Sequence, residues 1–376
     1  MQTVSSKLPP ELRLFFDFTK AVAILGVFSL HYYDIYLGYG ISVDRILRTG
    51  VLRYLSQDAN SPAGLACFIF RTAAAFGGIG VPLFIIASGF GVYYSFLSRD
   101  LSWRQFFLKR FVRVVPLFYS AVLVSVLIDL LVYRNPFYLT PEGAAAIGMN
   151  LLFLHVFSMK YSIASVFVFV GIIVQLYLLF PLFVKLFQHR RASWLFFAGA
   201  CVVPVVSAEL LQSAGSTFDG ALVFDYFPYF LFGMFLADSV YHGRNLHRIV
   251  LGRTVSLMAA AGVLVMVYMT SYYIDFAPAS RMLMSFLVFF SLPVLFETVT
   301  RLKLGGITGY ISAGAYAAYL FHMHIIRLAQ EYFLSRGPAV NAVVLGSLYA
   351  GLLVLTLTLS YGIQKNYDRL VRKVRA

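Results

Sequence analysis

The chain has 376 residues, of which 60% are hydrophobic, 17% are aromatic and only 12% are charged. Soluble domains carry about 25% charged residues, so this composition excludes a water-soluble globular protein. The net charge of +14 could suggest nucleic-acid binding, but the cations form short clusters between apolar blocks rather than one polar face. We therefore expect an all-α membrane protein surrounded by lipids, with no nucleic-acid partner.

Three long stretches contain no Asp, Glu, Lys or Arg: residues 161–184, 254–274 and 337–364. Each exceeds the roughly 20 residues that a helix needs to cross a bilayer. The strands of a membrane β-barrel alternate in polarity over about 10 residues, unlike these continuous blocks. The pattern predicts a polytopic helical bundle.

Ten membrane helices are predicted in chain order. They cover residues 14–33, 65–97, 114–133, 163–187, 194–211, 222–241, 254–275, 280–300, 308–328 and 341–363. With the N-terminus in the cytoplasm, 21 of the 30 cations fall in the inner segments, as the positive-inside rule requires. Both termini are therefore predicted to be cytoplasmic, and a prokaryotic cytoplasmic membrane fits best.

The remaining segments suggest one membrane domain covering residues 1–376. Residues 144–157 are apolar but too short to span, so they are predicted to be re-entrant or to lie at the outer surface. The first apolar stretch has no cleavage signature and should be retained as a helix. Cys67 and Cys201 stand in apolar surroundings without metal-ligand spacing, so we expect inert packing and no metal site.

The first predicted helix carries three ionisable residues, Asp17, Lys20 and His31, which are costly inside a membrane. Lys20 and His31 are separated by about 16 Å along a helix axis, so one serves the inner side and the other the outer half. A neutral imidazole in a partly dry site can accept a proton from a hydroxyl. His31 is therefore a candidate general base, and a buried structural histidine is the alternative.

The ninth predicted helix carries Tyr316, Tyr319 and His322 at intervals of three, which places them along one helical face. This face reaches the same outer half of the membrane as His31. We expect it to form a second wall of the same cavity. An interfacial belt of aromatic and histidine side chains is the alternative.

The segment between the second and third predicted helices, FFLKRFVRVVP, places Arg110 and Arg113 on one face at the cytoplasmic surface. Such a pair suits a phosphate, although simple positive-inside anchoring explains many similar clusters. Residues 77–91 lack the spacing of a phosphate-binding loop. Glycines in spanning helices commonly permit close packing, and Ser88 and Gly89 are expected to shape a passage.

Several motifs together resemble the acyltransferase-3 family of membrane O-acyltransferases. The opening RLFFDFTKAVAILGVFSLH resembles the family pattern in which a basic residue precedes a His by ten intervening positions. The resemblance continues in the family's order over nearly the whole chain. The further matching positions are Gly80, Val81, Phe84, Ser88, Gly89, Phe90, Arg110, Arg113, Pro116, Gln175, Tyr177, Pro181, Tyr316, Tyr319, Leu320 and His322.

The resemblance implies a ten-helix bundle that moves an acyl group, expected to be acetyl, from acyl-coenzyme A to a hydroxyl of a cell-surface glycan or related envelope acceptor. It implies no permanently bound cofactor, since acetyl-coenzyme A is a donor substrate. The implied catalytic residues are His31, Lys20 and Asp17. The implied donor-binding residues are Arg110, Arg113 and Ser88. The implied acceptor or cavity residues are Tyr177, Tyr316, Tyr319 and His322.

The sequence departs from the family pattern where Lys20 replaces the usual Arg, which keeps the charge but loses bidentate recognition of phosphate. Pro82 and Ala315 replace the commoner Asp and Ser, and Ile173 and Val174 stand where an acidic residue is frequent. A transporter or flippase is one alternative function, although no internal repeat is visible. A scaffold of polysaccharide export that has lost catalysis is another.

Overall fold

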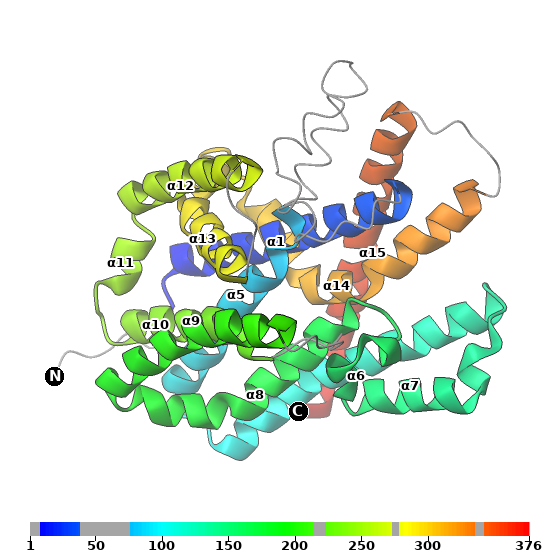
Figure 1. The fold of residues 1–376 in the computed structure, drawn as a ribbon, viewed down its shortest axis with the longest axis horizontal. Coiled ribbons are helices and arrows are strands. Elements are labelled where there is room, and N and C mark those ends of the chain that lie inside the picture. The colour runs from blue at the N-terminus through cyan, green and yellow to red at the C-terminus, as the bar shows by residue number, and fades with distance from the viewer. Residues whose placement is uncertain (1–7, 38–75, 214–222, 273–277, 335–341, 376) are drawn as a thin grey trace. The chain divides into compact units, whose positions relative to one another are not determined.

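The computed structural model describes residues 8–37, 76–213, 223–272, 278–334 and 342–375. Within these ranges the chain forms helices and turns and no strand, which confirms the predicted all-α class (Figure 1). The α-helices are α1 Pro10–Leu37, α5 Gly80–Arg99, α6 Trp103–Leu131, α7 Pro141–Leu151, α8 Phe167–Phe187, α9 Arg190–Ser213, α10 Phe227–Tyr241, α11 Leu246–Val250, α12 Arg253–Tyr272, α13 Pro278–Arg301, α14 Gly305–Leu334 and α15 Ala342–Arg375. The short 3-10 helices are η1 Pro136–Leu139, η2 Leu154–Phe157, η3 Met159–Tyr161 and η4 Val223–Tyr226.

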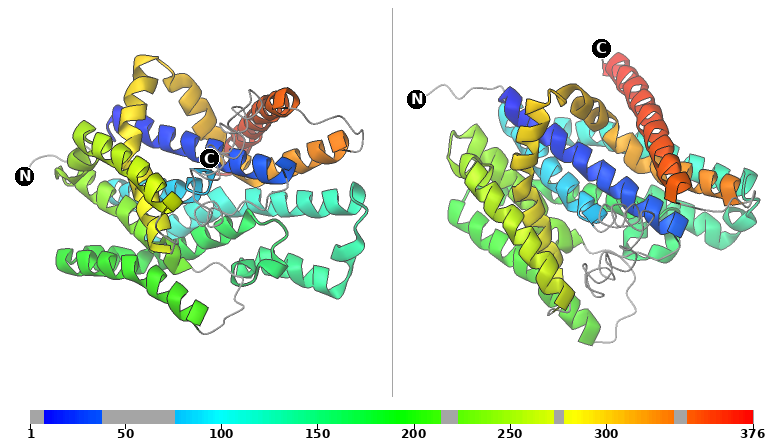
Figure 2. Two further views of the ribbon diagram at one scale, coloured as in Figure 1. Left: turned by 45° about the horizontal axis from the view of Figure 1, so that its top comes forward. Right: turned by 90° about the horizontal axis from the view of Figure 1, so that it is seen from above.

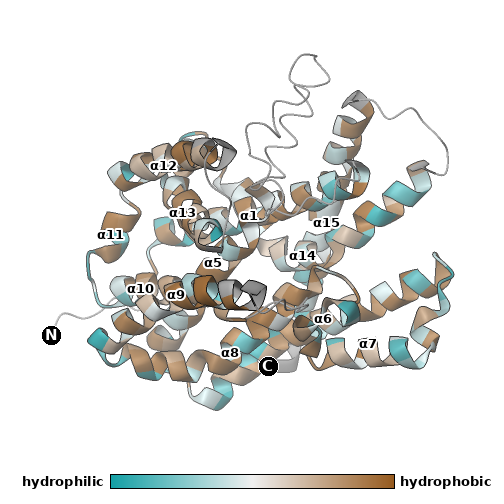
Figure 3. Ribbon diagram, viewed as in Figure 1, coloured by the Kyte–Doolittle hydropathy of each residue, from teal (hydrophilic) through white to brown (hydrophobic). Residues whose placement is uncertain are grey.

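Six helices of the described ranges are long and apolar enough to cross a membrane, namely α1, α5, α6, α8, α13 and α15. Shorter apolar helical segments lie within α9 and α12. Figure 3 shows that hydrophobic residues predominate along these helices. The chain is therefore a multi-pass membrane protein.

The chain divides into two compact units, and each is described by itself. Of the described residues, the first unit contains those between 85 and 244, and the second contains those between 8 and 84 and those from 245 onward. The division falls inside α5, between Phe84 and Ile85.

In the first unit, α6 and α8 pack through aromatic side chains. Phe106 stacks on Phe180 with ring centroids 4.6 Å apart, and Phe118 meets Phe167 at 5.1 Å. Since the partner numbers fall as the α6 numbers rise, the two helices run antiparallel. All four rings are buried, so they form the core of this unit.

Helix α6 begins earlier than predicted. The basic segment 106–116 was expected to connect two helices, with the third helix beginning at 114, whereas the helix is continuous from Trp103. Its start is fixed by a capping box, in which Ser102 accepts from the Gln105 amide and the Gln105 side chain accepts from the Ser102 amide. The predicted start at residue 114 was therefore too late: Arg110 and Arg113 do lie on a helix, as their spacing predicted, and that helix continues into the predicted third helix.

Helix α10 crosses α5 within the first unit at two glycines. A Cβ atom on Gly89 would lie 2.1 Å from the Phe230 carbonyl oxygen, and one on Gly233 would lie 2.2 Å from that of Ile86. The two backbones thus approach closely, as small residues permit between membrane helices. The close approach gives Gly89 a role in packing, and the passage expected there from the sequence stays a prediction.

The second unit is built around α1 and α14, which run parallel and lie side by side in Figures 1 and 2. Near its start α1 meets α14 through Asp17 and Ser312, and near its end through a bond from the Gln330 amide to the Ile35 carbonyl, 2.7 Å long. The numbers rise together on both helices. The groups at their middle are therefore held between two polar contacts.

Helix α15 packs against α1 in the opposite direction. Ser29 Oγ lies 2.8 Å from the Tyr349 hydroxyl, and the Tyr32 hydroxyl donates to the Leu345 carbonyl at 2.7 Å. Helix α15 has 34 residues, which corresponds to a length of about 51 Å. The hydrocarbon core of a bilayer is only about 30 Å thick, so this helix extends well beyond a single crossing.

The glycines before and at the start of α5 permit a close approach to α1. A Cβ atom on Gly77 would lie 2.3 Å from the Gly26 carbonyl oxygen, and one on Gly80 would lie 2.5 Å from that of Ala23. This agrees with the packing role expected for glycines in this stretch.

Residues 144–157 form the end of α7, a turn at Phe153 with φ of 59°, and η2. Buried Asn150 donates to the carbonyls of Ala146 and Tyr161 at 2.8 and 2.6 Å. His155 Nε2 donates to the Phe167 carbonyl at 2.9 Å, and burial lowers the pKa of this imidazole. The segment is too short to span, and its re-entrant or surface position stays a prediction.

Candidate functional site

The N-terminal part of α1 carries a polar cluster that includes two of the predicted catalytic residues. Lys20 Nζ donates to Asp17 Oδ1 at 2.7 Å, and Ser312 Oγ on α14 donates to the same oxygen at 2.8 Å. Both members of the ion pair are partly exposed. The spacing of three residues places the pair on one helix face. Lys20 therefore has its counter-ion within the protein, so its predicted contact with the donor would add to an existing pair.

The C-terminal part of α1 brings His31 to His322 of α14. Their ring centroids are 5.2 Å apart, with a 40° angle between the ring planes. His31 is partly exposed, whereas His322 is completely buried. The structure thus places together the two histidines that the sequence pattern assigned to facing walls.

Two aromatic rings enclose His322. The Tyr319 ring lies 5.9 Å from that of His322 and packs edge-on against Phe84 of α5 at 6.1 Å. Phe28 of α1 lies 6.5 Å from the His322 ring. Tyr316, predicted for the same wall, is half-buried. The imidazole therefore sits in a mainly apolar wall with the His31 ring at its edge.

Hydrogen bonds to the backbone define the tautomer of His322. Its Nδ1 lies 3.0 Å from the Ala318 carbonyl oxygen and 2.8 Å from that of Tyr319. A carbonyl oxygen only accepts, so Nδ1 carries the proton. The buried Nε2 then holds a lone pair, and it has no hydrogen-bond partner among the described residues.

The first unit holds the second cluster of predicted site residues, around Arg110 of α6. Only 8% of Arg110 is exposed, so its side chain is buried within the protein, and its position at the cytoplasmic surface stays a prediction. Its guanidinium carbon lies 5.7 Å from the centre of the Tyr177 ring and 5.8 Å from that of Phe106. Its Nε has no hydrogen-bond partner in the described part of the chain. The charge is therefore held by aromatic faces.

Of the other two residues predicted to bind the donor, one contacts Tyr177 and the other is exposed. Ser88 Oγ lies 2.9 Å from the hydroxyl of Tyr177, the residue whose ring faces Arg110. Arg113 is exposed, because three helical positions turn it only partly back toward Arg110. Ser88, Tyr177 and Arg110 thus form one cluster, here called the Arg110 cluster, and Arg113 lies outside it.

The family of the chain is given by a comparison with family models. Residues 13–365 match the acyltransferase-3 model, described as an acyltransferase domain. The chain belongs to the acyltransferase-3 family. Together with its apolar helices, this makes it a membrane acyltransferase. Searches of the curated proteins and of the solved structures found no match.

Sequence reasoning missed several polar contacts of this acyltransferase. Ser312 binds Asp17, and Ser29 binds Tyr349, each across two helices distant in sequence. Lone serines in apolar helices gave no signal of their own. The only clue in the sequence would have been hydroxyl residues placed to face the side of α1 that carries Asp17.

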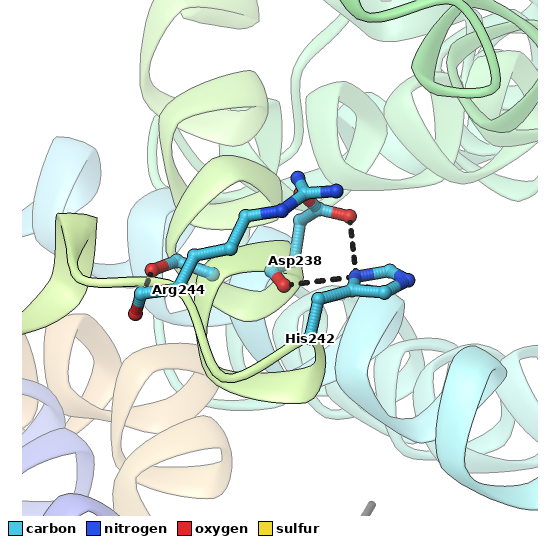
Figure 4. A network of polar contacts seen from close by, with 4 residues as sticks. Asp238, His242 and Arg244 are labelled. Atoms are coloured by element: carbon cyan, nitrogen blue, oxygen red, sulfur yellow. Dashed lines mark hydrogen bonds and ion pairs between the residues drawn. The ribbon is translucent and has the colours of Figure 1, made fainter. Parts of the chain in front are cut away.

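A further polar network closes the end of α10 in the acyltransferase (Figure 4). Asp238 binds His242 Nδ1 at 3.0 Å through one carboxylate oxygen and Arg244 through the other. Gly243 has φ of 64°, a conformation that suits glycine at a helix end. The Arg244 amide then donates to the Ser239 carbonyl at 2.7 Å. The network fixes a turn, which is a structural role.

Proposed function

We propose that this protein transfers an acyl group, acetyl in the simplest case, from acyl-coenzyme A to a hydroxyl of a cell-surface glycan or related envelope acceptor. Membership of the acyltransferase-3 family supports the reaction class. The proposed location is a prokaryotic cytoplasmic membrane, with one membrane domain spanning the chain. The donor and acceptor come from the residue chemistry described below and from the family resemblance.

The observation that carries the proposal is the state of Arg110. A buried cation is stable only when it is paired, and removal from water costs several kcal/mol per ion. No carboxylate of the described residues neutralises this guanidinium: the hydroxyl of Tyr177 acts on it favourably, and the charged groups that act on it are the cations Arg113 and Arg99. An anionic ligand would complete the site. The phosphates of coenzyme A meet this need, because Arg binds phosphate through charge-assisted hydrogen bonds.

The proposed reaction uses His31 as the base. Its ring nitrogen takes the proton of the acceptor hydroxyl while the hydroxyl oxygen attacks the carbonyl carbon of the thioester. The carbon–sulfur bond then breaks, and the departing thiolate takes the proton from His31. The products are an ester on the acceptor and the free thiol of coenzyme A. Tyr319 would border the reacting groups through its contact with His322.

The helix directions support the proposed topology of ten crossings with cytoplasmic ends. Parallel α1 and α14 fit the first and ninth crossings, and α15, which runs opposite to α1, fits the tenth. Reporters fused after Ala376 and inserted near Arg190 should both read cytoplasmic. Opposite readings for the two positions would overturn the helix count.

The decisive experiment for the function incubates the purified protein in detergent with labelled acetyl-coenzyme A and extracted envelope glycan. Transfer of label to glycan, with release of free coenzyme A thiol, supports the proposal. Binding of glycan without transfer at any donor concentration would overturn it in favour of an export scaffold or transporter. An Arg110→Ala variant serves as the control for donor dependence.

A further inference from the structure

We propose that His322 is the positioning residue of the base: its Nε2 lone pair accepts the N–H of His31 and so orients that imidazole for proton transfer. The inference rests on the proposed function, because it assigns a partner to the proposed base. It assigns to a neutral imidazole the role that a carboxylate fills in the Ser-His-Asp arrangement.

The tautomer of His322 is locked by its own helix. Two backbone carbonyls, those of Ala318 and Tyr319, hold the Nδ1 proton. The ring therefore has one remaining function, which is to accept a hydrogen bond at Nε2. This atom is buried and lacks a partner among the described residues, and a buried acceptor left without a partner destabilises the folded protein.

The donor that can meet this need is His31. Its ring lies 5.2 Å from the His322 ring, centre to centre. Imidazole rings at this separation can bring facing nitrogens within one hydrogen-bond length, about 2.9 Å, by a small rotation of the more exposed side chain. His31 is partly exposed and can rotate, whereas His322 is fixed by burial and by its carbonyl contacts.

The helices around the pair form a rigid frame. The α1 contacts with α14 lie on both sides of the histidines, at Asp17 and Ile35, and α15 binds another face of α1 through Ser29 and Tyr32. Helices held at several points fix side chains more closely than loops do. The separation between the rings is therefore set by the packing of the second unit.

The consequence for catalysis is a fixed direction of proton movement. When His31 donates one ring N–H to His322 Nε2, its other nitrogen carries the lone pair that receives the hydroxyl proton. The imidazolium formed on His31 keeps its hydrogen bond to His322, which stabilises the positive charge. The proton then returns to the leaving thiolate, so His322 neither gains nor loses a proton over the cycle.

The test compares three substitutions in the transfer assay. His322→Leu removes the acceptor and should lower kcat by roughly 100-fold while the KM for acetyl-coenzyme A changes little. His322→Gln keeps an oxygen able to accept from His31 and should recover kcat to within about tenfold of wild type. The matched control is His324→Leu, which removes a buried imidazole from the same helix and should keep kcat within about threefold.

Two kinetic outcomes would overturn the inference. One is a His322→Leu enzyme that retains more than about a tenth of the wild-type kcat, and the other is a His322→Gln enzyme no faster than His322→Leu. Elution as a single folded species in detergent is required for each variant. These results bear on the pair alone, since wild-type transfer is measured in parallel and its absence would overturn the proposed function instead.

A measurement independent of activity tests the tautomer. Solid-state NMR of protein labelled with nitrogen-15 in its histidine rings should show a signal of a neutral imidazole protonated at Nδ1 that disappears in His322→Gln and so belongs to His322. A His322 signal from a ring protonated at Nε2 would overturn the inference, even where His322→Leu misfolds. This readout needs neither donor nor acceptor, so it also stands if the protein transfers no acyl group.

Discussion

The two units treat their buried polar groups in opposite ways. In the second unit each predicted catalytic group has a protein partner at hand: Lys20 pairs with Asp17, and His31 faces His322. In the first unit Arg110 is buried between aromatic rings without a counter-ion among the described residues. The predicted catalytic groups of the second unit thus have neighbours within the protein, whereas Arg110 has no negative partner among the described residues.

This difference teaches how a membrane protein can separate chemistry from binding. Pairing within the protein lowers the free-energy cost of an ionisable group inside a membrane, and it holds the group in position in the absence of substrate. An incomplete site instead leaves part of its stabilisation to the ligand, so ligand binding stabilises the protein. The following changes test the comparison from its largest expected effect to its smallest.

The largest effect is expected at His31. His31→Gln should fold but lower the transfer rate by about 10² to 10⁴-fold, because the amide can hydrogen-bond but cannot accept a proton near neutral pH. Initial rates with labelled acetyl-coenzyme A measure the loss. His31→Ala should be inactive as well. A His31→Gln protein that keeps more than a tenth of normal turnover would remove His31 from the base role.

Substitution of Arg110 should change only the binding of the donor. Arg110→Ala should raise the KM for acetyl-coenzyme A by roughly 10 to 100-fold, the worth of a charged hydrogen bond of about 1.5–3 kcal/mol. Arg113→Ala is the matched control: the same charge is removed three residues away at an exposed position, so its KM should rise only a few-fold. Equal effects of the two substitutions would return both to membrane anchoring.

Donor binding should also stabilise the first unit through Arg110. Coenzyme A at 100 times its dissociation constant should raise the unfolding free energy by about 2.7 kcal/mol in the wild type. The same concentration should have a much smaller effect on Arg110→Ala. Thermal unfolding in detergent with and without the ligand measures both. An equal shift in the two proteins argues that phosphate binds elsewhere.

The glycine contact between α5 and α10 predicts a loss of stability without a change of charge. Gly89→Ala places a methyl group 2.1 Å from the Phe230 carbonyl oxygen, and such overpacking costs about 1–3 kcal/mol. Gly91→Ala, two residues further along α5, meets no atom within 4 Å and should leave the melting temperature unchanged or raise it. If both variants melt alike, the close approach is not present in solution.

The smallest effect is expected at the partly exposed Asp17 and Lys20 pair. Asp17→Asn should lower stability by about 1 kcal/mol, because it leaves Lys20 without its partner. The double variant Asp17→Asn with Lys20→Met should recover part of this loss, since neither charge then remains. The melting temperatures of the wild type, the single variant and the double variant measure these changes in stability. A double variant less stable than Asp17→Asn would show that the two residues act separately.

The sequence predicted the fold where apolar blocks were long. Each of the ten predicted segments overlaps a described helix, although the count of ten crossings stays a prediction. The start of α6 was placed too late because the apolar block marks only part of the helix, which continues back through the basic residues to Trp103. Its capping box at Ser102 and Gln105 carried the missing signal.

The site was predictable in its residue types but not in its pairing. His31 and His322 are far apart in sequence, and spacing alone placed them at the same depth, which the ring contact agrees with. The tautomer of His322 depends on backbone carbonyls that no pattern reveals. Arg110 is covered in part by Tyr177, which belongs to another helix. The sequence of α6 alone therefore could not predict how much of Arg110 is exposed.

The length of α15 has a consequence for the depth of the reaction in the bilayer. Its final part carries exposed Lys365, Arg369 and Arg372, which cannot enter hydrocarbon and so prevent the helix from sinking along the membrane normal. Through its bonds to Ser29 and Tyr32, α15 transmits this limit to α1. In a bilayer, we expect the basic end of α15 to limit how far α15, and with it His31 on α1, can move along the membrane normal.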